Sequence, residues 1–359
     1  MITPTYEWQF APQVEDADFT KIAKKAGLGP EVARLLFERG IQDQESLKKF
    51  LEPSLEDLHD PYLLHDMDKA VERIRQAIEE GENILIYGDY DADGMTSASI
   101  VKESLEQLGA ECRVYLPNRF TDGYGPNASV YKYFIEQEGI SLIVTVDNGV
   151  AGHEAIELAQ SMGVDVIVTD HHSMPETLPE AYAIVHPEHP DADYPFKQLA
   201  GCGVAFKLAC ALLEEVQVEL LDLVAIGTIA DMVSLTDENR ILVQYGLEML
   251  GHTQRIGLQE MLDMAGIAAN EVTEETIGFQ LAPRLNALGR LDDPNPAIDL
   301  LTGFDDEEAH EIALMIHQKN EERKEIVQSI YEEAKTMVDP EKKVQVLAKE
   351  GWNPGVLGI

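Results

Sequence analysis

Between residues 84 and 169 the sequence alternates short apolar runs with amphipathic segments, and this alternation constrains the fold more than any other feature. The apolar runs predict β-strands, and the longer amphipathic segments predict α-helices. The predicted strands are residues 84–87, 113–116, 142–146 and 164–169, and the predicted helices are residues 96–108, 128–137 and 154–162. Nearly continuous apolar strands that alternate with helices indicate an α/β fold, with a parallel sheet flanked by helices.

The sequence on either side of this alternation is predicted to be mostly helical. Helical patterns occur at residues 31–37, 68–80, 203–216, 219–229 and 241–250, and a long charged helix is expected at residues 305–337. Residues 344–348 have the pattern of a strand and predict the start of a second α/β domain.

The composition limits the class of protein. With 359 residues the chain has room for two or three domains of about 100–200 residues each, and 45% hydrophobic residues support a sizeable core. No apolar stretch approaches the roughly 20 residues of a membrane-spanning helix, and residues 1–14 lack the pattern of a secretory signal. The cysteines, Cys112, Cys202 and Cys210, have no metal-type spacing, which favours a reduced, cytoplasmic protein without a membrane partner.

The chain is strongly acidic, because 27 Lys and Arg residues stand against 66 Asp and Glu residues, a formal net charge of −39. This balance argues against a nucleic-acid partner, since phosphate binding usually leaves a basic footprint. It also fits a solvated acidic surface. Bound divalent cations and a few placed arginines can still form a local anion site, so the charge alone leaves the partner open.

Three carboxylates follow the first predicted strand. Asp89, Asp91 and Asp93 alternate along the chain, and an extended segment would aim them to one side. Like charges so close repel one another unless cations neutralise them, and carboxylate oxygens are ligands for hard divalent cations. The alternative is an acidic loop that caps the following helix, where Asp is favoured in any case. The residues alone leave both interpretations open.

Three further segments carry candidate ligands. Asp147 follows the third predicted strand, Asp170, His171 and His172 follow the fourth, and Asp231 ends a helical apolar run. In open α/β sheets ligands bind beyond the carboxyl ends of the strands, so we expect the strand-end residues at one edge. Carboxylate and imidazole groups together suit a divalent metal. One such Asp is more often a helix cap, but several in succession favour a metal site.

Taken in order, these segments resemble the motifs of the DHH phosphoesterase superfamily. The segments are Asp89-Tyr90-Asp91-Ala92-Asp93-Gly94, Asp147-Asn148-Gly149, Asp170-His171-His172 and Gly227-Thr228-Ile229-Ala230-Asp231. The form of the first motif, together with residues 199–207 and 283–291, resembles the RecJ branch, from about residue 20 to the last residue. The resemblance implies an exonuclease that degrades single-stranded DNA 5′→3′ to mononucleotides in DNA repair and recombination.

The resemblance also implies two divalent metal ions, Mn²⁺ or Mg²⁺, as cofactors. The implied ligands are Asp89, Asp91, Asp93, Asp147, His171 and Asp231. Asp147 would bridge the ions, Asp93 and His171 would hold one, and Asp91 and Asp231 the other. How Asp89 and Asp91 share the ligation stays open. His172 would lie beside the phosphate as a donor or leaving-group acid, and Asp170 would orient the motif.

Substrate contacts are implied for the loop at residues 118–127. Arg119 is one of six Lys or Arg residues between positions 84 and 235, against 24 Asp or Glu residues, which favours a phosphate contact over a surface salt bridge. Tyr124 fits either stacking on a base or packing. Asn127 belongs to the same loop, and Arg284 and Arg290 are implied to line the same cleft.

The resemblance also predicts the division of the chain. The predicted parts are a helical N-terminal lead-in (1–65), the DHH catalytic domain (66–235), a helical continuation (236–304), a connector helix (305–338) and a truncated start of the DHH-associated domain (339–359). We therefore expect a C-terminally truncated protein. Single-stranded DNA is the implied substrate, with a single-strand-binding protein and a helicase as further partners.

Three alternatives are weighed against this. A DHH phosphoesterase for short oligonucleotides or cyclic dinucleotides keeps the chemistry, but those branches show an Asn-Pro-Asp-Gly-Asp-like first motif. A RecJ-like replication scaffold has lost metal ligands, whereas every expected ligand is present here. A pyrophosphatase of the superfamily has a histidine in its first motif, where this chain has Tyr87, four residues before Asp91.

Overall fold

The computed structural model describes residues 17–358 and divides the chain into two compact units, with the boundary between Asp57 and Leu58. The finer division predicted from the sequence stays a prediction.

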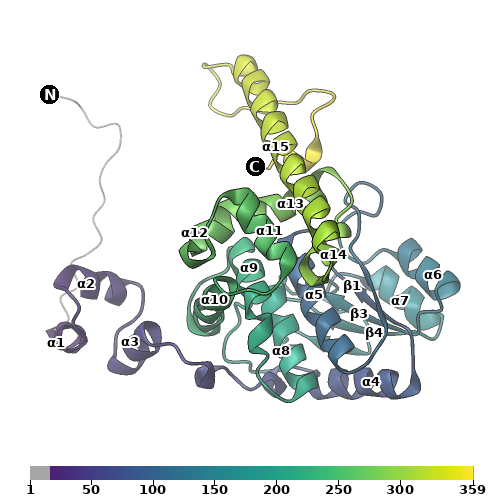
Figure 1. Cartoon of the computed structure of the whole chain (residues 1–359), viewed down its shortest axis with the longest axis horizontal. Coiled ribbons are helices and arrows are strands. Elements are labelled where there is room, and N and C mark those ends of the chain that lie inside the picture. Colours follow the sequence, from purple (N-terminus) through teal and green to yellow (C-terminus); the bar gives the residue numbers. More distant parts are fainter. Residues whose placement is uncertain (1–16, 359) are drawn as a thin grey trace. The chain divides into compact units, whose positions relative to one another are not determined.

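The first unit is a small helical cluster (Figure 1). Its elements are α1 (Ala17–Lys25), α2 (Pro30–Glu38), α3 (Gln44–Leu51) and the 3-10 turn η1 (Leu55–Asp57). Phe19, Leu36 and Leu47 are buried in its core. Asp43 starts α3 by accepting hydrogen bonds from the backbone N–H groups of Glu45 and Ser46, which a helix start otherwise leaves open.

The second unit is built around a five-stranded sheet. Its strands are β1 (Ile84–Tyr87), β2 (Cys112–Tyr115), β3 (Leu142–Val146), β4 (Asp165–Thr169) and β5 (Ala183–Val185). They pair in the order β2-β1-β3-β4-β5, and each pairing is parallel. The predicted parallel sheet is therefore confirmed. Strand β5 was not predicted, because three residues are too few to show a period.

Helices precede, separate and follow these strands. They are η2 (Pro61–Leu63), α4 (Met67–Glu80), α5 (Ala92–Gln107), α6 (Ala128–Gln137), α7 (His153–Ser161), α8 (Gly201–Leu213), η3 (Val218–Leu220), α9 (Leu221–Ala230), α10 (Asp237–Leu250), α11 (Ile256–Ala265), η4 (Ala269–Glu271), α12 (Glu274–Thr276), the π-helical η5 (Ile277–Leu281), α13 (Ala282–Leu291), α14 (Pro296–Thr302), α15 (Asp306–Met337) and η6 (Pro354–Val356). Within the described residues, none is both long and apolar enough to cross a bilayer.

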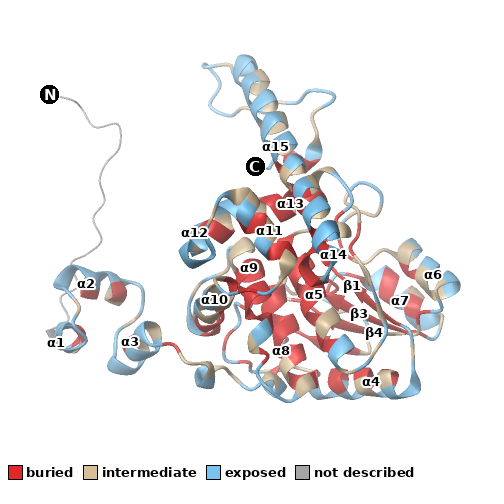
Figure 2. Cartoon of the chain, viewed as in Figure 1, coloured by how far each residue is buried: buried red, intermediate tan, exposed pale blue. Residues whose placement is uncertain are grey.

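Helices cover both faces of the sheet, whose central strands β1 and β3 are buried (Figure 2). Successive side chains of a strand point to opposite faces. On one face Leu85, Ile143 and Val166 share a buried cluster with Tyr131 of α6 and Ile156 of α7. Helices α5 and α8 pack against the sheet as well, and α5 also packs against α9. The polar loops at the strand ends are thereby supported by rigid elements.

The prediction of a strand at residues 344–348 is wrong. This segment has no strand hydrogen bonds, and Val344 and Val346 are 76% and 90% exposed. A strand needs the backbone groups of a neighbour, and no described strand pairs with this one. Instead, the Gln345 side chain donates to the carbonyls of Asp339 (2.7 Å) and Lys342 (2.9 Å), which holds a local turn.

A buried ion pair fastens the start of the second unit to its helices. Lys207 of α8 and Glu238 of α10 are 2% and 0% exposed and pair with each other. The backbone N–H of His59 donates to Glu238 (2.9 Å), and its carbonyl accepts from Lys207 (2.6 Å). The Tyr194 hydroxyl also donates to Glu238 (2.6 Å). With these partners both charges are satisfied away from water.

Lys207→Met is expected to lower the free energy of unfolding by about 3–5 kcal/mol, because it leaves the Glu238 carboxylate buried without its counter-charge. Lys132→Met is the matched control, since the side chain of Lys132 is 57% exposed and surface pairs of this kind contribute about 0–1 kcal/mol. Urea unfolding followed by circular dichroism measures both. An equal loss of stability in the two variants would contradict the role given to Lys207.

Candidate metal centre

The candidate ligands gather where the central strands end. Asp89 lies two residues after β1, Asp147 directly follows β3, and residues 170–172 directly follow β4. These strands are parallel neighbours, so their carboxyl ends lie at one edge of the sheet (Figure 1). Asp231 reaches the same place from the end of α9.

The three aspartates of the first motif do not lie in one extended segment, so of the two interpretations left open by the sequence, the structure shows the helix cap. Asp91 is the N-cap of α5 and accepts hydrogen bonds from the N–H groups of Asp93 (3.0 Å) and Gly94 (3.1 Å), and Asp93 is already in the first turn. The helix cap is favoured over an extended segment because the short Asp side chain accepts hydrogen bonds from the unpaired N–H groups at a helix start. A Cβ at Gly94 would lie 2.5 Å from the Asp89 carbonyl oxygen, so glycine permits the tight turn that gathers the carboxylates.

The N-terminus of α8 holds Asp93. The backbone N–H groups of Gly201 and Cys202 donate to its two carboxylate oxygens, at 2.7 Å and 2.9 Å. A helix N-terminus presents N–H groups and favours negative charge, so α8 stabilises this carboxylate. Gly227 of α9 packs so closely that a Cβ there would lie 2.6 Å from Asp93 Oδ1. The sequence singled out these residues only as family marks, because their contacts join distant segments.

Asp147 lies at the centre of the cluster in a strained backbone conformation. Its φ is +60°, in the left-handed region that residues other than glycine rarely adopt. The next residue locks this turn, because the Asn148 side chain donates to the carbonyls of Val146 (2.8 Å) and Tyr87 (3.3 Å). Gly201 approaches so closely that a Cβ there would lie 2.4 Å from Asp147 Oδ1. Such strain persists where the surroundings enforce it, often at functional sites.

Two facing atoms of the cluster have no hydrogen-bond partner. Asp147 Oδ1 and His171 Nε2 are buried and 3.0 Å apart, but they do not have the geometry of a hydrogen bond. His171 also approaches Asp93 Oδ2 with its Nε2 and Asp231 Oδ2 with its Nδ1, each at 3.7 Å. Buried polar atoms are almost always satisfied, so these two require a partner. A divalent cation fits, since it would bind both lone pairs.

Burial and mutual repulsion raise the pKa of several carboxyl groups here. Burial, and then the charge of Asp91, raises the pKa of Asp89 to about 8. Burial, and then the charge of Asp93, raises the pKa of Asp231 to about 7. Burial, and then the charges of Asp93 and Asp91, raises the pKa of Asp147 well above its usual range. A cluster of this kind calls for bound cations as counter-charge.

The donor atoms form three overlapping sets. The sets are Asp89, Asp91 and Asp147; Asp93, His171 and Asp231; and Asp147, His171 and His172, and within each set the donor atoms lie within 4.8 Å of one another. Asp231 lies in one set with Asp93 and His171, and the implied sharing of one ion by Asp231 and Asp91 stays a prediction. Oxygen and imidazole donors in this number suit two ions such as Mn²⁺ or Mg²⁺.

Asp170 orients the two histidines. Its carboxylate accepts hydrogen bonds from the N–H groups of Val150 (3.0 Å), His171 (2.7 Å) and His172 (3.0 Å), and it also bonds His172 Nδ1 (2.8 Å). Burial alone would raise the pKa of Asp170, but the bonds with His172 lower it. The side-chain bond with Asp170 raises the pKa of His172 to about 9, against the effect of burial. Asp170 thereby fixes the orientation of the His172 ring.

Arg119 and Tyr124 lie beside the cluster. The Arg119 guanidinium lies over the ring of Tyr90, 4.3 Å from its centroid, and its Nε has no hydrogen-bond partner. The Tyr124 hydroxyl is 2.9 Å from Nε2 of His172, and 56% of Tyr124 is exposed. Tyr90 was not singled out from the sequence, because nothing in its position within the first motif marks it as a platform for an arginine.

The other predicted substrate residues have structural partners. Asn127 caps α6 and also donates to the carbonyl of Asp122 (2.8 Å). Arg284 is 5% exposed and donates to the carbonyl of Gln280 (2.6 Å). Arg290 donates to a backbone carbonyl (2.9 Å) and lines a hollow of about 570 Å³. That these three residues bind substrate stays a prediction.

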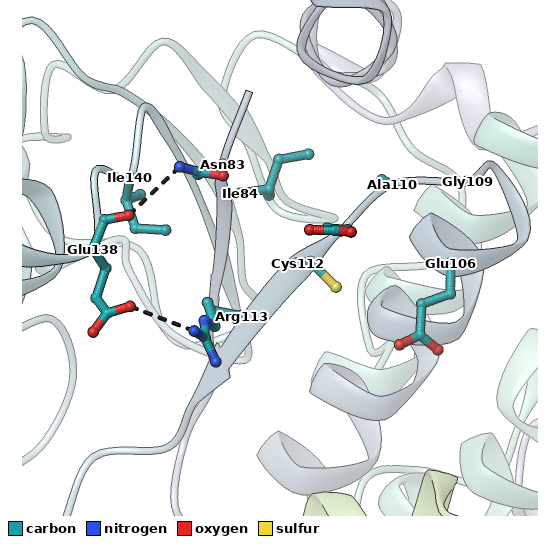
Figure 3. A pocket seen from close by; sticks show the side chains of 10 residues that line it. Asn83, Ile84, Glu106, Gly109, Ala110, Cys112, Arg113, Glu138 and Ile140 are labelled. Carbon is teal, nitrogen blue, oxygen red and sulfur yellow. Dashed lines mark hydrogen bonds and ion pairs between the residues drawn. The ribbon is translucent and has the colours of Figure 1, made fainter. Parts of the chain in front are cut away.

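Another hollow, of about 710 Å³, lies at the opposite end of the sheet (Figure 3). Its lining includes Ile84 and Cys112, the first residues of β1 and β2, and the ion pair between Arg113 and Glu138 (3.5 Å). Parallel strands begin at this end and deliver the candidate ligands at the other. No predicted site residue lines this hollow, so it adds nothing to the metal centre.

Known proteins are similar to this chain in sequence and in fold. The family described as "DHH family, N-terminal domain" matches residues 83–228. The single-stranded-DNA-specific exonuclease RecJ of Bacillus subtilis is 48% identical, over 100% of this chain and 46% of that protein. RecJ of Escherichia coli is 38% identical, over 93% of this chain and 61% of that protein. The chain thus spans about half to three fifths of these relatives.

Solved structures agree. The crystal structure of an exonuclease RecJ bound to manganese is 34% identical, with a TM-score of 0.77 over 85% of this chain and 77% of that one. RecJ of Thermus thermophilus in complex with Mn²⁺ is 32% identical, with a TM-score of 0.82 over 95% of this chain and 49% of that one. The parallel sheet and its helices are thus the fold of the DHH family. Within it, the chain belongs to the RecJ family.

Gly201→Ala is expected to weaken Mn²⁺ binding about 10- to 100-fold, because the new methyl group would displace the Asp147 carboxylate. Gly203→Ala is the matched control on the same helix, where a Cβ would meet only the flexible side chain of Leu199, at 3.2 Å. Isothermal titration calorimetry gives both affinities, and circular dichroism checks that each variant is folded. If Gly201→Ala binds Mn²⁺ as the control does, Asp147 is not a ligand.

Proposed function

We propose that this chain carries the catalytic centre of a metal-dependent nuclease that degrades single-stranded DNA 5′→3′ to mononucleotides, in DNA repair and recombination. The observation that carries the proposal is the pair of unpartnered atoms, Asp147 Oδ1 and His171 Nε2, amid a cluster of carboxylates. The names of the relatives support the substrate, since they are single-stranded-DNA-specific exonucleases. The chain spans only part of these relatives, so the activity is inferred from the centre it contains.

The proposed cofactors are two Mn²⁺ or Mg²⁺ ions. The proposed ligands are Asp89, Asp91, Asp93, Asp147, His171 and Asp231. Two such ions, when bound, lower the pKa of a water nucleophile and neutralise the charge that develops on the phosphate. Structures of RecJ relatives with Mn²⁺ and with Mg²⁺ support this choice. The residues of the chain hold the geometry, through the α8 N-terminus at Asp93 and the α5 cap at Asp91.

Four further residues are proposed to position the substrate. His172, oriented by Asp170, offers a hydrogen bond or a proton to the phosphate or to its leaving oxygen. The Nε of Arg119 lacks a partner, which suits a contact with a phosphate oxygen. Tyr124, exposed beside His172, offers a ring for a base to stack on.

The proposed setting is the cytoplasm, with a single-strand-binding protein and a helicase as partners. Free cysteines at positions 112, 202 and 210 support a reducing compartment. The partners rest on the family resemblance, because an exonuclease for single strands needs a supply of unwound DNA. Co-purification of the tagged chain with either protein would test this part.

Cleavage of DNA tests the proposal directly. The chain should release mononucleotides from the 5′ end of a labelled single strand in Mn²⁺ or Mg²⁺, leave duplex DNA intact, and be inactive in chelator. Asp147→Asn should abolish cleavage, because it removes the charge of the proposed bridging ligand without changing its size. Chromatography of the products against time measures the outcome.

Two other results would replace the proposal. Faster cleavage of dinucleotides or cyclic dinucleotides than of long strands would make the chain a phosphoesterase for short substrates. Absence of both cleavage and Mn²⁺ binding in calorimetry would favour a non-enzymatic scaffold. A third result is Mn²⁺ binding that is lost in Asp147→Asn, while the wild-type chain cleaves no substrate. It would support the proposed metal site and contradict the proposed nuclease activity of this chain.

Asp170→Asn is expected to lower kcat about 10- to 100-fold, because it weakens the bond that orients His172. Asp165→Asn is the matched control, since Asp165 begins β4, the strand that Asp170 follows, and pairs with Arg73 (2.6 Å). The control should keep its kcat. Imidazole NMR signals of His172 should shift in Asp170→Asn and stay in place in Asp165→Asn. An unchanged kcat in Asp170→Asn would remove its positioning role.

A further inference from the structure

Positive charge in the first unit is confined to its three α-helices, because residues 52–57 of this unit add Glu52, Glu56 and Asp57 and no Lys or Arg. Residues 17–51, which form α1, α2 and α3, hold seven of the 27 Lys and Arg residues but only five of the 66 Asp and Glu residues. The three helices therefore carry a positive formal charge in a chain whose net charge is −39. A basic segment within a strongly acidic chain is the electrostatic footprint expected of a site for polyanions.

Most acidic side chains of these helices form local ion pairs, and three lysines have no ion-pair partner among the described residues. The pairs are Lys21 with Asp18 (2.9 Å), Arg34 with Glu38 (3.6 Å) and Lys49 with Glu45 (3.2 Å). Asp43 is used as the cap of α3. Lys24, Lys25 and Lys48 are exposed and form no ion pair with any residue that the structure describes. Their charges are available to an external anion.

Two of these lysines line a hollow whose other lining residues are mostly apolar. The hollow has a volume of about 230 Å³. Its lining residues are Ile22 and Lys25 of α1, Ala26 directly after α1, Gln44, Leu47, Lys48 and Leu51 of α3, and Glu52 directly after α3. Lys25 of α1 and Lys48 of α3 thus line the same hollow as four apolar side chains, and Glu52 is its one acidic lining residue. A single nucleic-acid strand has the matching pattern, since its phosphates alternate with bases that have large apolar faces.

We propose that the first unit is a docking site for single-stranded DNA, in which Lys24, Lys25 and Lys48 bind phosphates and the hollow between α1 and α3 receives a base. The identity of the strand rests on the proposed function. The docking site itself lies outside residues 83–228, the part that matches the DHH domain. Because both units belong to one chain, docking raises the effective concentration of the strand at the acidic catalytic unit, whose own charge repels it.

Binding is tested on the full chain in chelator, so that no cleavage takes place. The triple variant Lys24→Gln, Lys25→Gln, Lys48→Gln removes the three charges and keeps good helix formers at those positions. Fluorescence anisotropy with labelled oligothymidylate should give an affinity up to about 100-fold lower at 0.1 M salt, if each phosphate contact contributes through counterion release. The slope of log affinity against log salt should fall by about 2, since a single strand contributes roughly 0.7 per contact.

The matched control is the triple variant Lys132→Gln, Lys197→Gln, Lys335→Gln, which removes the same charge from exposed lysines of the second unit. It should keep both the affinity and the salt slope. Equal losses in the two triple variants, or no loss in either, would overturn the docking site. Binding of the wild-type chain to phosphatidylserine vesicles but not to oligothymidylate would also overturn it, because the lysines would then face a membrane.

Failure of this proposal is distinguishable from failure of the nuclease. Hydrolysis of a dinucleotide in Mn²⁺ tests the catalytic centre alone, because a dinucleotide is too short to depend on a separate docking unit. Loss of oligothymidylate binding in the first triple variant would support docking whether or not dinucleotides are cut. Circular dichroism and thermal unfolding of both variants check that the helices remain folded.

Discussion

Repulsion among buried carboxylates is the constraint on which the rest of this structure depends. Asp147 shares its surroundings with Asp91 and Asp93, and burial together with their charges makes ionisation of Asp147 costly. The fold counters this with directed N–H groups: α8 points its N-terminus at Asp93, and the start of α5 donates to Asp91. Glycines on α8 and α9 then let these helices approach within contact of the carboxylates. The same helix starts and glycines therefore allow close helix packing and also stabilise the carboxylate charges.

The sheet and the helices have different tasks in this arrangement. Parallel strands deliver Asp89, Asp147 and His171 to one edge, because each strand ends on the same side. The helices α5, α8 and α9 then fix Asp93 and Asp231 against that edge. The hollow at the amino ends of β1 and β2 has no comparable set of donors (Figure 3). The candidate metal ligands thus lie at one end of the sheet because the strands all run in the same direction.

The sheet could be predicted from the sequence because its central strands are apolar throughout and their period is local. The same local signals predicted α6 and α15 closely. Strand β5 was missed because it is short, and the strand at residues 344–348 was wrong because pairing depends on a neighbour that no local pattern shows. In the candidate site, the residue types were predictable from the motifs. Their partners were not, since Asn127 caps a helix, Arg284 is buried and Asp93 is held by α8.

The candidate ligands are spread from Asp89 to Asp231, over three strands' ends and two helices, and this dispersal links the centre to folding. In an unfolded chain the donors are far apart, so a divalent ion that bridges them would bind the folded state alone. Free ion at 100 times its dissociation constant would then add about 2.7 kcal/mol to the stability of the second unit. The concentration of the ion would set how much of the chain is folded, and not only how fast it works.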